Sequence, residues 1–205
     1  PGLRFGFLEG GVGWAANLFS DILGHFEKRN RDAIAHYDPN QLDRALLEKL
    51  LAEHAPAPVR ASLDRLDDAL LMLSDPDEAP ASIDEFADSG IESPEDIRDL
   101  FEQQFFFGCE ADDPMNAIAF DRGKIPMQAR LNAVFASDIG HWDVPDFREV
   151  LPEAWELVED GHLDRNDFRA FTCDNAIGLL AGARPDFFAG TAVEDYAAKR
   201  QRERS

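Results

Sequence analysis

Residues 3–13 read LRFGFLEGGVG, a short apolar segment that runs directly into a glycine-rich turn. An apolar run of this length, bounded by glycine, predicts a buried β-strand. The residues that follow carry Trp14, Leu18 and Phe26 at helical spacing, which predicts a helix over residues 14–29. A strand, a turn and a helix in succession form a βα unit, the building block of parallel α/β folds.

Two later segments have the same character. Residues 105–109 read FFFGC and are followed by a cluster of acids that begins at Glu110, while residues 133–137 read AVFAS and are followed by Asp138. Both predict buried strands. In β/α folds, functional groups collect at the carboxyl ends of the strands. We therefore expect Glu9, Glu110 and Asp138 to lie at one edge of a sheet.

The rest of the chain is predicted to be mainly helical. Residues 31–104 form a leucine-rich, acidic insertion that ends in a helix starting at Pro94 and capped by Ser93. Residues 145–160 predict another helix, and the tail over residues 197–205 is expected to fray. Asp164 caps a last packed helix, whose apolar side is expected to consist of Phe168, Phe171, Ile177 and Leu180.

Composition excludes several classes of partner. The formal net charge is -21, which disfavours nucleic acid and anionic membranes because both repel an acidic surface. No apolar run approaches the length of a membrane span. The two cysteines, Cys109 and Cys173, lie far apart and outside any CxxC pair, so we expect reduced thiols and a cytoplasmic location. We expect a small-molecule substrate, and homo-oligomer formation stays open.

Asp138 and His141 are the sharpest candidates for chemistry. A carboxylate at a strand end can bind a metal or take a proton, and a histidine three residues later can contact substrate or hold the loop. The alternative is that Asp138 only caps the next turn. Glu9 follows an apolar strand, where an unpaired carboxylate is costly, although an ion pair with a nearby arginine would satisfy it.

The remaining candidates are weaker. Gly10 and Gly11 allow close approach of a ligand or a backbone, but the run over residues 10–13 lacks the GxxxxGK[ST] pattern of a phosphate loop. The acids that begin at Glu110 either contact substrate or are simply solvated. Residues 156–167 resemble a calcium loop only superficially, because the third position lacks an oxygen ligand and the twelfth is not Glu.

Two motifs resemble the amidohydrolase-related family, the decarboxylase-like branch of the amidohydrolase superfamily. The first is FLEGGVGW over residues 7–14, and the second is ASDIGHWD over residues 136–143, which is similar to the last barrel strand of that family. The region around Asn175 is similar to the closing helix of the family. The resemblance covers residues 5 to 190, and its Asp-x-x-His strand end is the more specific part.

The resemblance implies a (β/α)8 barrel, a divalent metal that is commonly zinc, and hydrolysis or non-oxidative decarboxylation of small, often aromatic, carboxylated compounds. It implies that Asp138 is a metal ligand or proton-transfer group and that His141 and Glu9 take part in catalysis. Glu9 occupies the place at which many decarboxylating relatives have histidine. It further implies that the substrate is bound by Gly10, Gly11, Trp14 and Glu110.

A whole barrel takes roughly 250 residues. We therefore expect residues 1–196 to be the C-terminal portion of a TIM barrel, comprising about three βα units (strands six to eight) and the insertion over residues 31–104. The early HxH pair and the strand-five histidine of the family are missing from this sequence, so the other metal ligands are expected outside the chain. The leading hypothesis is a metal-dependent hydrolase. The alternatives are a decarboxylase of the same family and a non-catalytic acidic α/β interaction module.

Overall fold

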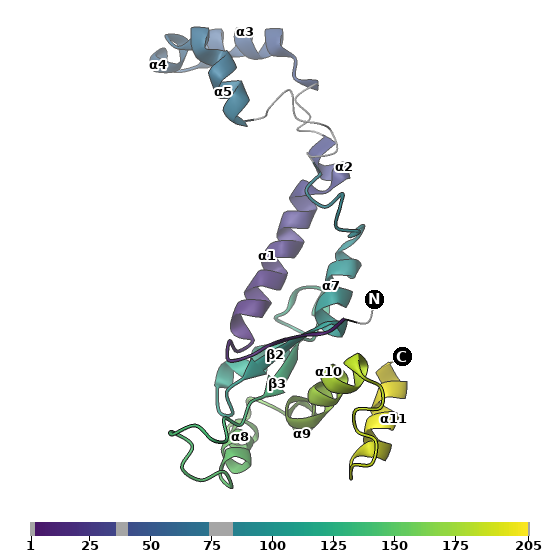
Figure 1. Ribbon diagram of the computed structural model, residues 1–205. Coiled ribbons are helices and arrows are strands. Elements are labelled where there is room, and N and C mark those ends of the chain that lie inside the picture. Colours follow the sequence, from purple (N-terminus) through teal and green to yellow (C-terminus); the bar gives the residue numbers. More distant parts are fainter. Residues whose placement is uncertain (1–2, 36–40, 74–83, 205) are drawn as a thin grey trace. The chain divides into compact units, whose positions relative to one another are not determined.

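The computed structural model describes residues 3–35, 41–73 and 84–204. Within these ranges the chain is mixed α/β, with helices around a small parallel sheet. The sheet has the strand order β1 (Phe5–Phe7), β2 (Phe105–Cys109) and β3 (Asn132–Phe135) (Figure 1). The predicted α/β class is confirmed. Strand β2 has the predicted bounds, whereas β1 is shorter than predicted and β3 begins one residue earlier. The prediction that the first strand is buried is wrong, because β1 lies at the edge of the sheet and all three of its residues are exposed.

The chain divides into two compact units. The sheet unit comprises Pro1–Leu23 and Ser93–Ser205, and the helical unit comprises Gly24–Glu92. The predicted insertion over residues 31–104 overlaps the helical unit, but its last helix belongs to the sheet unit.

Aromatic rings cover one face of the sheet. Phe7 and Phe107 stack with their ring centroids 5.6 Å apart, and the Trp14 ring meets both edge-on. Trp14 lies in the first turn of α1 (Gly13–Arg29). Edge-on and offset ring pairs of this kind stabilise a core beyond the area that they bury. Figure 1 shows α1 and α7 (Pro94–Gln103) on this side of the strands.

The opposite face is covered by α10 (Asn175–Ala183). A Cβ atom built on Gly6 of β1 would lie 3.4 Å from the Leu179 Cδ2 atom of this helix, which is ordinary van der Waals contact. On β3, the Ala133 carbonyl accepts a hydrogen bond of 2.8 Å from the Asn175 side chain. Helices therefore pack on both faces of the sheet, as is typical of parallel sheets, although the edge strand β1 stays exposed.

Helix α7 begins as the sequence predicts. Ser93 is the N-cap, its hydroxyl accepts from the Asp96 amide, and the Asp96 carboxylate accepts from the Ser93 amide. Pro94 occupies the first helical position, where a missing N–H costs nothing. This reciprocal capping box directs Ile97 and Phe101 into the core, where both are buried.

The segment from α8 to α10 shows two departures from prediction. A helix was predicted over residues 145–160, but helix α8 is Val150–Glu159. Residues 145–149 are therefore not helical. The Asp146 carboxylate instead accepts from the Arg148 amide and guanidinium, and this local pairing competes with a helix. Asp164 caps α9 (Arg165–Arg169) as predicted.

A π-helical turn, η6 (Ala170–Asp174), then links α9 to α10. A π turn inserts one extra residue into the helix. Beyond it the apolar side is shifted by one position, so that Ala181 is buried while Leu180 is 36% exposed. The prediction of Leu180 on the buried side is therefore wrong.

Helix α11 (Glu194–Arg204) includes residues that were expected to fray. Ala197 is buried against Ile177 and Ala181 of α10. Because this contact and the ion pair of Arg200 with buried Asp174 hold the helix, residues 197–204 are ordered as helix rather than a loose tail. Two 3₁₀ segments complete the sheet unit, η4 (Pro114–Ala119) and η5 (Pro126–Gln128).

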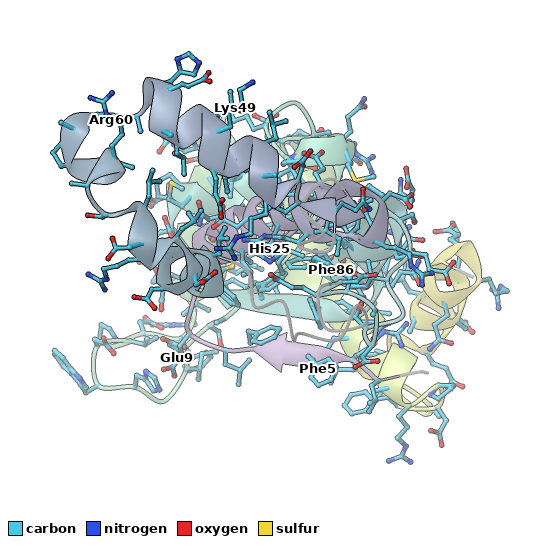
Figure 2. The ribbon with its side chains drawn as sticks, turned by 90° about the horizontal axis from the view of Figure 1, so that it is seen from above. Phe5, Glu9, His25, Lys49, Arg60 and Phe86 are labelled. Carbon is cyan, nitrogen blue, oxygen red and sulfur yellow. The ribbon has the colours of Figure 1, made fainter. Side chains whose placement is uncertain are left out.

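The helical unit contains the remaining elements, which are α2 (Arg31–Ile34), α3 (Arg44–His54), α4 (Ala57–Arg60), η3 (Leu63–Arg65) and α5 (Leu66–Leu73). The Arg44 guanidinium pairs with Asp67 and so ties α3 to α5. Near the end of α1, His25 pairs with Glu85, and the His25 and Phe86 rings lie close together (Figure 2). Residues 74–83 of the predicted insertion lie outside the described residues.

None of the helices in the described ranges combines the length and the apolar character that crossing a membrane requires.

Candidate active site at the carboxyl edge of the sheet

The carboxyl ends of the three strands meet at one edge, as the sequence predicts. All three strands are parallel, with Phe7 paired to Phe107 and Cys109 paired to Phe135. The pairing continues past the strand ends, because the Gly11 amide donates to the Gly108 carbonyl (3.0 Å) and the Ala136 amide donates to the Cys109 carbonyl (2.9 Å). The segments that carry Glu9 and Asp138 are therefore fixed on either side of the end of β2.

Glu9 and Asp138 share an uncommon backbone conformation. Their φ angles are 60° and 49°, in the left-handed region that disfavours residues with a side chain. Such residues cost free energy, of order 1–3 kcal/mol each, and they cluster at functional sites. The two carboxylates predicted for this edge thus lie in strained turns that follow β1 and β3.

Glycine is required where β2 approaches β1. A Cβ atom on Gly108 would lie 3.2 Å from the Leu8 Cα atom, so a side chain there would push the strand ends apart. A Cβ atom on Gly10 would lie 2.9 Å from the Trp14 Nε1 atom. Gly10 therefore gives the Trp14 indole room over the turn, a packing role for two residues that were predicted to bind substrate. Gly11, at φ 64°, adopts the left-handed turn.

Asp138 and His141 form a pair within one turn. The His141 amide donates to the Asp138 carbonyl (2.9 Å), and the His141 Nδ1 atom lies 3.6 Å from the Asp138 Oδ2 atom. The side chain of Asp138 is 29% exposed and that of His141 is 54% exposed. A ligand can therefore reach both groups. At 3.6 Å the pair is an ion pair when His141 is protonated rather than a short hydrogen bond.

Glu110 is an exposed residue whose carboxyl pKa is raised above its ordinary value. Burial raises the pKa of its carboxyl, and the negative charges of Asp138, Asp112, Glu9 and Asp143 raise it further. Like charges act in this way because each disfavours the ionised form of the others. The shift shows that acids from all three strand ends act on one group. The structure thus brings together the predicted residues Glu9, Glu110 and Asp138.

Asp113 and Asn116, which follow β2, have roles that are visible only in the structure. The Asp113 carboxylate accepts from the Met115 amide (2.8 Å) and caps η4. Asn116 is fully buried, and its Nδ2 atom donates to the Glu110 carbonyl (2.7 Å). The Asn116 Oδ1 atom has no hydrogen-bond partner among the described residues. Sequence reasoning missed Asn116, although an amide inside the apolar run of η4 was a usable signal.

Metal ligands are incomplete at this edge. Within residues 3–35, 41–73 and 84–204, no group of three or more His, Cys, Asp or Glu side chains is arranged to hold a metal ion. Asp138 and His141 are two ligand types of the kind that zinc prefers, and a catalytic zinc site needs three protein ligands. The described residues therefore do not fit a complete zinc site.

The two thiols play no part at the edge surface. Cys109 is buried at the end of β2, and burial raises the pKa of its thiol to about 12. Cys173 lies in η6, and partial burial, together with the charge of Asp174, raises the pKa of its thiol. Neither is activated as a nucleophile, because only the thiolate reacts.

Comparisons of the chain with protein-family models, with curated proteins and with solved structures found no match.

Proposed function

We propose that the carboxyl edge of the sheet is part of the active site of an amidohydrolase-type hydrolase that acts on a small, carboxylated, often aromatic compound. The observation that carries the proposal is the Asp138–His141 pair, which stands at a strand end beside Glu110 and opposite Glu9. The resemblance of residues 136–143 to the last barrel strand of that family supports the same assignment.

We propose further that β1, β2 and β3 are strands six to eight of a (β/α)8 barrel. Their parallel direction and sequential order support this, because neighbouring strands of such a barrel follow one another in the chain. In a closed barrel one face of every strand looks inward. The proposal therefore requires Leu179 of α10 to leave Gly6 when the barrel is complete.

The chain's own residues suit proton transfer. In hydrolysis, water adds to a carbonyl carbon, one proton leaves the water, and one proton reaches the leaving group. The Asp138 carboxylate takes the first proton, with His141 beside it to stabilise or relay the charge. Glu110, whose raised pKa keeps it protonated to higher pH, supplies the second. A bound zinc would activate the water, but the described residues do not complete its site.

Electrostatics restricts how such a substrate binds. Five carboxylates gather at this edge, namely those of Glu9, Glu110, Asp112, Asp138 and Asp143. A substrate carboxylate would be repelled unless a cation lies between it and the edge. The proposed reaction therefore needs a cation at this edge for binding as well as for chemistry.

The test is the Asp138→Asn variant of the protein expressed from its complete reading frame. We expect turnover of aromatic amide or ester substrates to fall by at least a hundredfold, because the amide cannot accept the proton. Asp160→Asn, at the exposed end of α8, is the control for a lost charge. Undiminished turnover and metal content in the Asp138 variant would contradict the assignment. Carbon dioxide release in the same assay would indicate decarboxylation instead.

A second candidate function is a non-catalytic interaction module, and the exposed leucines of α3 favour it. Leu46 and Leu50 are 50% and 44% exposed and lie one turn apart, and Leu42, just before the helix, is 43% exposed. Leu47 and Leu51, by contrast, are half-buried. An apolar stripe on an otherwise polar helix is typical of a protein-binding face.

The reading frame upstream of residue 1 separates the two candidates. A His-x-His segment in frame, followed by the early barrel strands, would support the hydrolase. Its absence would favour the module, and then Leu46→Glu with Leu50→Glu should leave helix content unchanged while lowering association with other proteins or with itself.

A further inference from the structure

Strand β1 has one edge that no strand of the described residues covers. The sheet order is β1, β2, β3, so β1 pairs with β2 on one side only. On that side the Phe5 amide donates to the Gln104 carbonyl (2.8 Å). Because backbone groups alternate in direction along a strand, the N–H and C=O groups of Gly6 point the other way, out of the sheet. Figure 2 shows β1 at the border of the sheet, in the segment that carries the labels Phe5 and Glu9.

The side chains of this edge strand are apolar and exposed. Leu8 is 79% exposed, Leu3 is 65% exposed and Phe5 is 47% exposed. Natural sheets protect an open edge with charged side chains, proline or a bulge, and an apolar open edge is a template for a further strand. Between Leu3 and Leu8 the only charged residue is Arg4, and the segment has no proline. The occupant that fits this edge is therefore an extended strand, because a strand satisfies the alternating N–H and C=O groups.

The sequence of β1 is complementary to itself about Gly6. When two copies pair antiparallel across a two-fold axis at Gly6, the two Gly6 residues exchange both of their hydrogen bonds. The same register places Phe5 opposite Phe7 of the copy, in the closely spaced type of pair that makes no hydrogen bonds. Both rings contact Phe105 on one face of the sheet, so pairing extends the aromatic cluster of that face into the second copy.

The charges at the two ends of β1 also suit this arrangement. The two-fold axis brings the Arg4 end of one copy beside the Glu9 end of the other, and it does so twice. Neither side chain has an ion-pair partner among the described residues, and the buried Arg4 Nε atom has no hydrogen bond there. The net charge of -21 repels a second copy at long range, but salt at physiological strength screens this repulsion beyond about 8 Å. Contacts at the edge therefore decide whether two copies associate.

We propose that the chain forms a symmetric dimer in which β1 pairs antiparallel with β1 of a second copy, centred on Gly6. The two three-stranded sheets then join into one continuous sheet. The dimer is a property of the chain of residues 1–205 and does not rest on the proposed hydrolysis. In a longer polypeptide the fifth strand of the proposed barrel would occupy the same edge, so the two proposals are tested on polypeptides of different length.

Sedimentation equilibrium of the chain of residues 1–205, over a wide range of protein concentration, measures the association. We expect a monomer–dimer equilibrium for the wild type. Gly6→Pro removes the outward N–H, leaves the hydrogen bonds to β2 in place and is tolerated in an edge strand. Since each dimer then loses both central hydrogen bonds, dimerisation should weaken at least about tenfold. Gly6→Ala is the matched control, because it adds the same Cβ atom, 3.4 Å from the Leu179 Cδ2 atom, but keeps the N–H. It should dimerise as the wild type does.

Amide hydrogen exchange locates the interface. The Gly6 and Leu8 amides should exchange more slowly as the protein concentration rises, whereas the Phe5 amide, which bonds to β2, should not change. Circular dichroism shows whether Gly6→Pro folds. If it does not, Leu8→Lys takes its place, because a charge on an exposed edge blocks pairing. Leu151→Lys, at an exposed leucine of α8, is the control for that change.

Three results would overturn the proposal. The first is a monomer at every concentration, and the second is a dimer that neither Gly6→Pro nor Leu8→Lys weakens. The third is a dimer that dissociates only when Leu46 and Leu50 are both replaced by glutamate, because that result assigns the interface to α3. Turnover by the product of the complete reading frame, or its loss in Asp138→Asn, has no bearing on the dimer, so the two proposals fail separately.

Discussion

Replacing Asp174 by asparagine should detach α11 from the sheet unit. The Asp174 carboxylate is 4% exposed and accepts from the Tyr196 hydroxyl (2.7 Å), from Arg200 Nη2 (2.9 Å) and more weakly from Arg169 Nε (3.4 Å). Asparagine keeps the size but loses the charge and one acceptor. Hydrogen bonds to charged groups contribute about 1.5–3 kcal/mol each, and two of these bonds are short. We therefore expect a loss of about 3–5 kcal/mol, in the range for a broken buried ion pair.

Urea denaturation and amide hydrogen exchange measure this effect. For a chain of this size, a loss of that order lowers the melting temperature by about 10 °C, and the amides of residues 194–204 should exchange faster than those of the sheet. The Cys173 thiol packs against the cluster of Ile177, Ala181 and Ala197. It should therefore react faster with a thiol reagent in the variant. Asp186→Asn is the control, because its pair with Arg184 is exposed on both sides and such pairs contribute about 0–1 kcal/mol. A loss below about 1 kcal/mol with unchanged exchange in the Asp174 variant would refute the reasoning.

Four smaller predictions follow, the last of which has a matched control at Met127. Ser93→Ala removes the N-cap and should cost about 1 kcal/mol in urea denaturation; Gly108→Ala forces a Cβ atom against the main chain of β1 and should cost about 1–3 kcal/mol in the same assay. Because the folded state raises the pKa of Glu110, stability falls as pH rises from the ordinary pKa of a glutamate through the raised one; Glu110→Gln should remove that fall in a pH series of melts, and an unchanged slope would contradict it. Glu9→Gly should relieve the left-handed strain and raise stability by about 0.5–1 kcal/mol while lowering turnover, whereas Met127→Gly, at φ 56°, should raise stability without affecting turnover.

The sequence was sufficient to predict helix caps and strand bounds that depend on neighbouring residues. The cap at Ser93, the cap at Asp164 and the bounds of β2 each depend on a few neighbouring residues, and the structure has all three. The gathering of Glu9, Glu110 and Asp138 could also be predicted, because parallel strands bring their carboxyl ends to one edge.

Features that depend on tertiary contacts could not be predicted. The π turn at η6 is favoured by the packing of Phe171 and the hydrogen bond from Asn175 to β3, neither of which has a pattern in the sequence. Helix α11 is strongly polar, and its order depends on the packing of Ala197 and on the ion pair of Arg200 with buried Asp174. The unsatisfied Oδ1 atom of Asn116 depends on the surroundings of one side chain in three dimensions.

The backbone strain at Glu9 and Asp138 bears on whether these carboxylates are functional or only cap turns. A residue that merely caps a turn gains nothing from a left-handed φ that costs free energy, and asparagine, aspartate or glycine is the economical choice there. Asp138 agrees with this expectation, because a short polar side chain tolerates the left-handed conformation. Glu9 does not, since glutamate has a longer side chain and is not one of these residues. Of the two left-handed residues, Glu9 therefore gives the stronger support to the proposed function, and Asp138 lies on the other side of the same strand end.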